Sequence, residues 1–401
     1  MQRIINYIIP INLVMDLLLV VTKNVAFIKA ALMTALLVHL MIKYLGKHRD
    51  YNWIFVFGFY ALIIALISTD LFTSLINTIK IIIPMFCILI GYHFFNTKEK
   101  IKMVANSMKI TLIIIIINLA ICTVLGIGNE NYIEEGEEGQ FLMGQLSDHW
   151  NMFTYSILTV PIILHFQTKR GKIYTAFLAF FNAILVILSI KRIAIIGLLG
   201  GGFINLFFTL STKKIITFLS VIIIVVAVTF PLYSSFLQAR FDARSDRFEE
   251  GSLEKESRLL ETFYVWEDAT SFKPVSKSLF GLEAFNSAGN YGGGRFGDRQ
   301  LHVDYNNIVN TIGLVGLVIY LIVFIQLWTS FKFYLNQIVI RDKFSQTMKA
   351  TFYTFFIIQF MTSLAGQMYN ITFRMILFIF LGSAIGYFKQ LKNRQIEGNY
   401  N

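Results

Sequence analysis

Apolar stretches long enough to cross a lipid bilayer recur along almost the whole 401-residue chain. The hydrocarbon core of a bilayer is about 30 Å thick, and a helix of about 20 apolar residues crosses it. Lipid offers the backbone no hydrogen-bond partners, so each such segment must be helical. With 56% hydrophobic residues, the chain carries more apolar surface than a soluble protein of this size can bury. The sequence therefore predicts an all-α polytopic membrane protein.

Twelve segments have the length and composition of transmembrane helices. The predicted spans are 4–21, 24–45, 52–68, 71–95, 108–127, 149–166, 173–190, 193–211, 215–234, 304–331, 350–369 and 373–388. One long connection remains, which we expect to contain a few short helices. The predicted organisation is nine helices in 1–234, a long loop at 235–303, three helices in 304–388 and a tail at 389–401.

The distribution of Lys and Arg predicts the orientation of these spans. With the N-terminus inside, cytoplasmic segments hold 20 of the 35 Lys and Arg residues. The short outer segments hold 5, namely Lys23, Lys29, Lys191, Arg192 and Arg374. The loop at 235–303 is too long to follow this rule. The bias predicts that both termini are cytoplasmic and that the long loop is periplasmic. It also explains the net charge of +11 by membrane topology rather than by nucleic acid binding.

Several cations lie on the predicted outer face against this bias. Lys191 and Arg192 separate two apolar stretches. In the long loop, Arg240, Arg244 and Arg247 recur at helical spacing, so they share one face of a helix. Like charges at this spacing destabilise a bare helix. We therefore expect an anion against them, either a phospholipid headgroup or a phosphorylated substrate.

An amphipathic helix is predicted at 251–272, with Arg258 near the edge of its apolar stripe. The stripe consists of Leu259, Leu260, Phe263 and Trp266. Such a stripe can lie on the membrane or on other helices. Arg258 can form a local i, i+3 pair with Glu261, or it can serve the function of the loop.

His302 and Asp304 stand at the outer mouth of the tenth predicted span. A His can take a proton near neutral pH, and a carboxylate two residues away can orient it. Arg holds phosphate groups by paired hydrogen bonds. Together, the outer cations and His302 indicate group transfer from a phosphorylated, membrane-bound donor. Asp298 with His302 and Asp304 is the one set that could hold a metal ion, and we expect no metal and no cofactor.

The architecture and three segments resemble the bacterial O-antigen polymerase and O-antigen ligase superfamily. In SIKRIAIIGLLGG (189–201), Arg192 stands at the family's Arg position, and Lys191 stands where Ser is usual. SRLLETFYVWEDA and SLFGLEAF (within 257–285) are similar to the Arg…Trp…Phe-Gly segment of the family's loop, with Glu283 where a second Gly is common. HVDYNNIVNTIGLVGLVIY (302–320) is similar to the His-x-x-Tyr segment followed by Gly-x-x-Gly.

The resemblance implies a glycosyltransferase that acts at the outer face of the bacterial inner membrane on a glycan carried by undecaprenyl diphosphate. It implies that Arg192 and Arg258 hold the departing diphosphate, and that His302, oriented by Asp304, takes the proton of the acceptor. Residues expected to bind the diphosphate or the glycan are Lys191, Arg240, Arg244, Arg247 and Tyr305. The reaction inverts the anomeric carbon. Expected partners are membrane lipids, a polysaccharide chain-length regulator and a flippase.

Two alternatives to an O-antigen polymerase remain open from the sequence. An O-antigen ligase uses the same donor but transfers the glycan to the lipid A core, and an Arg-rich loop favours the polymerase, whose two substrates both carry diphosphate. A lipid-linked oligosaccharide transporter or flippase would have its site near the membrane midplane. Its candidate residues are Asp16, His39, Lys80, His93 and Arg374, of which Lys80 is the best.

Overall fold

The computed structural model describes most of the chain as helices. The described residues are 5–19, 24–47, 49–125, 172–188, 192–209, nine positions between 211 and 234, 257–294, 296–297, 299–339, 342–364, 366 and 368–397. Within these residues every regular element is an α-helix or a short 3-10 helix, and no strand occurs. The predicted all-α class therefore holds for the part of the chain that the structure describes.

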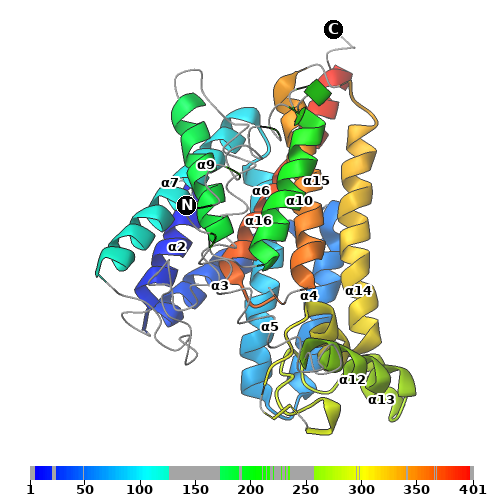
Figure 1. Cartoon of the computed structure of the whole chain (residues 1–401). Coiled ribbons are helices and arrows are strands. Elements are labelled where there is room, and N and C mark those ends of the chain that lie inside the picture. The colour runs from blue at the N-terminus through cyan, green and yellow to red at the C-terminus, as the bar shows by residue number, and fades with distance from the viewer. Residues whose placement is uncertain are drawn as a thin grey trace.

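The described helices coincide with most of the predicted spans (Figure 1). They are α2 (Ile8–Leu19), α3 (Asn24–Tyr44), α4 (Asn52–Ile67), α5 (Leu71–Phe86), α6 (Ile88–Phe94), α7 (Lys98–Leu125), α9 (Lys172–Leu188), α10 (Arg192–Thr209), α14 (Asp304–Leu335), α15 (Lys343–Ser363) and α16 (Ile371–Glu397). The predicted span 149–166 lies outside the described residues, as does 215–234 apart from single positions.

Three helices extend beyond the predicted apolar spans. α7 begins at Lys98 rather than at 108, α15 begins at Lys343 rather than at 350, and α16 continues to Glu397. The predicted tail at 389–401 thus begins as helix. Hydropathy identifies only the apolar part of a helix, which suits lipid. Lys, Arg, Glu and Gln are good helix formers, so a helix can continue beyond its apolar part into a polar segment.

Among the described residues, five helical segments are long and apolar enough to cross a membrane. They are Arg49–Ile67, Leu71–Phe94, Lys98–Cys122, Asp304–Leu335 and Ile371–Ile396. The first includes the 3-10 helix η1 (Arg49–Tyr51), and the second joins α5 and α6 across Cys87. These segments suit a helical membrane protein, and the total of twelve spans stays a prediction.

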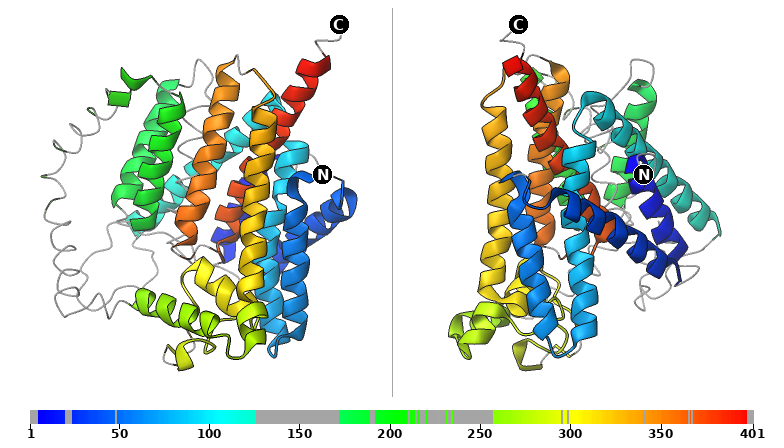
Figure 2. Two further views of the ribbon diagram at one scale, coloured as in Figure 1. Left: turned by 90° about the vertical axis from the view of Figure 1, so that its right-hand side faces the viewer. Right: turned by 180° about the vertical axis from the view of Figure 1, so that it is seen from behind.

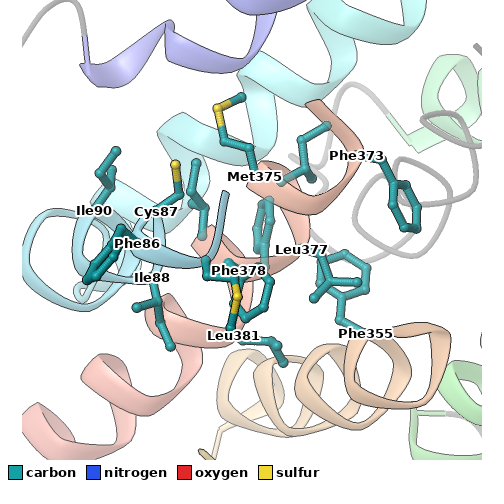
Figure 3. Close-up of a cluster of buried hydrophobic side chains, with 14 of the residues drawn as sticks. Phe86, Cys87, Ile88, Ile90, Phe355, Phe373, Met375, Leu377, Phe378 and Leu381 are labelled. Atoms are coloured by element: carbon teal, nitrogen blue, oxygen red, sulfur yellow. The ribbon is translucent and has the colours of Figure 1, made fainter. Parts of the chain in front are cut away.

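α16 is the central helix of the bundle. It packs against α5, α6, α14 and α15, and every side chain from Thr372 to Phe388 is buried. Figure 3 shows Phe378 and Leu381 of α16 among side chains of α5, α6 and α15. α6 lies close to α16 because glycines face the contact: a Cβ on Gly91 would lie 1.9 Å from the carbonyl oxygen of Ile379.

Short helices of the long loop gather at the end of the molecule opposite the C-terminus (Figures 1 and 2). They are α12 (Ser257–Ser271), α13 (Val275–Phe280) and the 3-10 helix η4 (Gly292–Gly294). This confirms the expected short helices for the described part of the loop. α12 and α13 both pack on α14, which begins at this end.

The end of α13 is seated in a break of α14. Gly313 interrupts α14 with φ 74° and ψ 179°, and Gly281 follows α13 with φ 77°. A Cβ on Gly281 would lie 2.2 Å from the carbonyl oxygen of Thr311, and a Cβ on Gly313 would lie 2.2 Å from that of Leu279. Both positions therefore require glycine, for the left-handed φ and for the close approach of two backbones.

Glu283 binds the N-terminus of α5. Its buried carboxylate accepts hydrogen bonds from the backbone N–H of Thr69 at 2.9 Å, the N–H of Asp70 at 3.3 Å and the Ser74 hydroxyl at 3.3 Å. A helix N-terminus has unpaired N–H groups and a positive dipole end, so a carboxylate is favourable there. Glu283 of the long loop therefore caps α5.

Candidate functional site

Polar and apolar contacts join α12 to the beginning of α14. The indole N–H of Trp266 donates to Asn306 Oδ1 at 3.2 Å, and Asn306 Nδ2 donates to Thr262 Oγ1 at 2.7 Å. Beside these bonds lies a small apolar core made of Val265, Ala269, Tyr291, Leu301 and Val309. The long loop is therefore held on α14 at the residues that follow His302.

Glu261, Arg299 and His302 form a charged cluster at this junction. Glu261 has no solvent exposure, and its Oε1 lies 3.0 Å from Arg299 Nη2. Its Oε2 lies 3.7 Å from His302 Nδ1. The side chains of Arg299 and His302 are each 38% exposed. A buried carboxylate thus holds a cation and an imidazole that both reach solvent.

The contact between Arg299 and His302 indicates which ring nitrogen carries the proton. Arg299 Nε and Nη2 lie 3.4 Å and 3.3 Å from His302 Nδ1. A guanidinium can only donate, so Nδ1 must accept in this arrangement, and a neutral ring then carries its proton on Nε2. If Arg299 moves away, Nδ1–H can donate to Glu261 instead, and Nε2 becomes the basic nitrogen. Contact with Arg299 thus favours the tautomer in which Nδ1 accepts.

Tyr291 and Gly366 lie next to the cluster. Tyr291 is 2% exposed, and its burial, followed by the negative charge of Glu261, raises the pKa of its phenol to about 12. Gly366 has φ 78°, and a Cβ there would lie 1.5 Å from the carbonyl oxygen of His302. The segment after α15 thus packs directly on the backbone of His302, so a side chain at position 366 would displace the imidazole.

Asp304 begins α14, and its side chain contacts the segment before α16 and the first turn of α16. Its Oδ1 accepts the backbone N–H of Met368 at 2.8 Å, and its Oδ2 lies 3.6 Å from Arg374 Nη1. Asp304 is 2% exposed and Arg374 is 1% exposed. The carboxylate that the structure brings beside the ring of His302 is Glu261, so the assignment of Asp304 as the residue that orients His302 stays a prediction.

Arg374 lies inside the bundle rather than at the outer turn where hydropathy placed it. It is on the first turn of α16, where its Nη2 donates to the hydroxyl of Tyr320 at 2.7 Å. Gln359 Nε2 donates to the same hydroxyl at 3.0 Å. Tyr305, a predicted substrate-binding residue, is half-buried, with its ring centroid 6.4 Å from that of Tyr320. A buried network thus continues inward from the beginning of α14.

A second set of contacting polar side chains lies between α2, α3 and α16. Lys29 pairs with Asp16, and Thr372 donates to the same carboxylate. Lys29 was expected in a short outer segment, but it is 7% exposed within α3, because its ammonium reaches Asp16 across the helix pair. Of the residues that favoured a transporter, Lys80 is exposed on α5, whereas Asp16 and Arg374 are paired with opposite charges.

The predicted diphosphate-binding cations are described only in part. Arg192 is the first residue of α10 and Arg258 is the second residue of α12, but their side chains lie outside the described residues. Lys191, Arg240, Arg244 and Arg247 lie entirely outside them. Arg258 precedes Glu261 by three positions, and positions three apart share a helix face.

The backbone of α10 runs antiparallel to α15. Gly200 faces Met361 near the end of α15, whereas Phe208 stacks on Tyr353, which lies earlier in α15. The beginning of α10, with Arg192, is therefore directed toward the end of α15. That end leads into the segment whose Gly366 packs on His302.

Sequence reasoning missed two residues of the cluster and did not identify the face of α12 that packs on the rest of the protein. Leu259 and Phe263 of the predicted stripe are exposed, by 52% and 61%, whereas Glu261 is fully buried. The buried face also contains Val265 and Ala269, at 1% and 6%. The buried positions 261, 265 and 269 have the spacing i, i+4, i+8 of one helix face. The larger apolar side chains Leu259 and Phe263 drew attention to a different face. Arg299, three residues before His302, carried no pattern of its own.

The described residues contain no group of three or more His, Cys, Asp or Glu side chains that could hold a metal ion. Comparison with protein-family models and with curated proteins gives no match to this chain. The site offers three groups for chemistry: an imidazole that can accept a proton, a buried carboxylate that can orient it, and a guanidinium that can bind an anion.

Proposed function

We propose that the chain is an O-antigen polymerase, or a polymerase of a related surface polysaccharide, in the bacterial inner membrane. The observation that carries the proposal is the cluster of Glu261, Arg299 and His302 at the loop end of α14. It combines a base with an anion-binding group at one end of an apolar helical bundle. A membrane-bound, phosphorylated glycan donor needs both groups at the surface of the bilayer.

The first part of the proposed mechanism is the activation of the acceptor. The diphosphate of the donor attracts the guanidinium of Arg299 away from His302 Nδ1 and from Glu261, and charge-assisted bonds to phosphate replace both contacts. The partly exposed ring then exchanges its proton with water, losing it from Nε2 and gaining it at Nδ1, and Nδ1–H donates to Glu261, which lies 3.7 Å away. Nε2 is left as the base, and it takes the proton from the attacking hydroxyl of the acceptor glycan.

The second part is the departure of the carrier. The acceptor oxygen forms a bond to C1 of the donor sugar while the bond from C1 to the diphosphate oxygen breaks, and its electron pair leaves with undecaprenyl diphosphate. Negative charge grows on the diphosphate, so cations that contact it stabilise the transition state more than the ground state. Arg192 and Arg258 are proposed for this contact, helped by Lys191 and the Arg residues at 240–247. Attack opposite the leaving group inverts the anomeric carbon.

A gel of surface glycan tests the proposal and distinguishes a polymerase from a ligase. A deletion strain of the native organism is complemented with wild-type, His302→Ala or Arg192→Ala protein, and immunoblots verify equal protein levels. His39→Ala, at an exposed position on α3, is the control. We expect core capped by one repeat unit in both site variants and full polymer in the control. Uncapped core with polymer left on its carrier would instead indicate a ligase, and full polymer from the His302→Ala strain would contradict the mechanism.

Arg192→Lys is the finer test of diphosphate binding. Lys keeps the charge but lacks the planar fork that binds two phosphate oxygens at once. We expect shorter chains than in wild type and longer chains than with Arg192→Ala, read from the same gel. Wild-type chain lengths would mean that charge alone is sufficient at this position.

A further inference from the structure

A lateral groove lies between α10, α14 and α15, three helices that stand side by side in Figures 1 and 2. Its volume is about 550 Å³, which falls within the range of about 300–1,000 Å³ that is common for ligand sites. Its wall is mostly aromatic, with Phe207 and Phe208 on α10, Trp328 on α14 and Tyr353 on α15. None of these residues belongs to the cluster around His302.

Two ammonium groups lie at one end of this groove. Lys332 Nζ lies 5.4 Å from the ring centroids of both Trp328 and Tyr353, and Lys349 Nζ lies 5.5 Å from that of Phe208. In the described part of the chain, no carboxylate forms a salt bridge with either of them. The groove thus joins an apolar wall to two cations that no described acidic residue neutralises.

The position of the two lysines indicates which kind of ligand the groove can bind. Lys332 is in the last turn of α14 and Lys349 is near the beginning of α15, at the end of the bundle away from α12. Positive side chains at this end meet the anionic headgroups of the cytoplasmic leaflet under the predicted orientation. An apolar wall suits an acyl chain, and paired ammonium groups suit a phosphate.

We propose that this groove binds one anionic phospholipid of the cytoplasmic leaflet, with its phosphate between Lys332 and Lys349 and an acyl chain along the aromatic wall. Charge complementarity selects this occupant, because a zwitterionic lipid or an apolar segment would leave both ammonium groups without a net counter-charge. The proposal does not depend on the reaction at His302.

Native mass spectrometry of the full chain tests the groove. Delipidated protein in neutral detergent is mixed with phosphatidylglycerol or phosphatidylcholine, and the bound fraction is measured. Wild type should retain phosphatidylglycerol in preference to phosphatidylcholine. Lys332→Gln/Lys349→Gln should lower that preference by about tenfold, since each cation near a headgroup contributes appreciably to binding.

Two further variants make the result specific. Lys98→Gln/Lys392→Gln removes two cations that also lie over aromatic rings but do not line the groove, and it should keep the wild-type preference. Lys332→Arg/Lys349→Arg keeps the charges and should keep the preference as well. Equal retention of both lipids by wild type, an unchanged preference in the Gln variant, or an equal loss in the Lys98/Lys392 variant would overturn the proposal.

Discussion

Glu261 is fully buried and lies within reach of a guanidinium and an imidazole that are both partly exposed. A buried carboxylate is costly unless charged or hydrogen-bonding groups face it. Its position therefore makes sense if the two outward-facing groups need a fixed, negatively charged support. We therefore propose that Glu261 positions His302 and does not contact the substrate.

Glu261→Gln tests this positioning role. The amide keeps the size of the side chain but cannot stabilise a positive charge on His302 when the ring takes a proton. We expect chain growth to fall about 10- to 100-fold, by analogy with other groups that support a catalytic residue. The rate of polymer formation in isolated membranes is the measurement. Glu267→Gln, at an exposed position on the same helix, should keep the wild-type rate. An equal loss in both variants would mean that the substitutions act by destabilising α12.

Asp304 and Arg374 form the second testable pair. Each is buried, so removing one leaves the other charge without its partner, a loss that typically costs about 3–5 kcal/mol. Asp304→Asn and Arg374→Met should each lower the melting temperature in detergent by roughly 5 °C or more. The double variant should be less destabilised than the sum of the two single variants, because no unpaired charge remains. Additive losses would mean that the two groups do not stabilise each other.

Sequence reasoning could identify single residues of the site but not their contacts. His302 stood out because it lies two residues before a span. Glu261 was recognised only as a local partner of Arg258, because the distance from α12 to position 302 is set by tertiary packing. Lys29 and Arg374 were assigned to outer turns, since hydropathy excludes charges from spans and cannot foresee that a partner on another helix will bury them.

At the scale of elements, apolar length predicted the existence of the helices better than their ends. α4, α5 and α10 begin within one residue of the predicted spans, whereas α7 and α15 begin earlier, in charged segments that lipid does not select. The seating of α13 in the break of α14 had no sequence signal beyond two glycines. A positive φ and a close backbone approach become visible only when both partners are in place.

Gly281→Ala tests that seating. Its Cβ would meet the carbonyl oxygen of Thr311 at 2.2 Å in addition to the strain of φ 77°. Gly293→Ala is the matched control, because Gly293 also has a positive φ of 61° but nothing within 4 Å of its Cβ position. The left-handed strain alone costs about 1–2 kcal/mol. We expect Gly281→Ala to lower the melting temperature clearly more than Gly293→Ala does. Equal shifts would mean that α13 is not seated against α14.

The orientation of the whole molecule in the membrane decides whether the cluster can bind a substrate in the outer leaflet. The account places α12 and α13 outside and the beginning of α15 inside. Cys87 and Cys122 are 0% and 1% exposed, so single cysteines can be labelled over a low background. We expect Ser276→Cys to react with an impermeant maleimide in spheroplasts, and Gln346→Cys to react only after permeabilisation; both positions are exposed. The reverse pattern would place the loop in the cytoplasm.

The most direct measurement is polymer formation by the purified protein in liposomes that contain lipid-linked repeat units from the native strain. Polymer length and free undecaprenyl diphosphate are quantified together by mass spectrometry. The account predicts one released carrier for each new glycosidic bond with wild-type protein, and neither product with His302→Ala. Polymer made by His302→Ala protein, or bonds formed by wild type without release of the carrier, would contradict it.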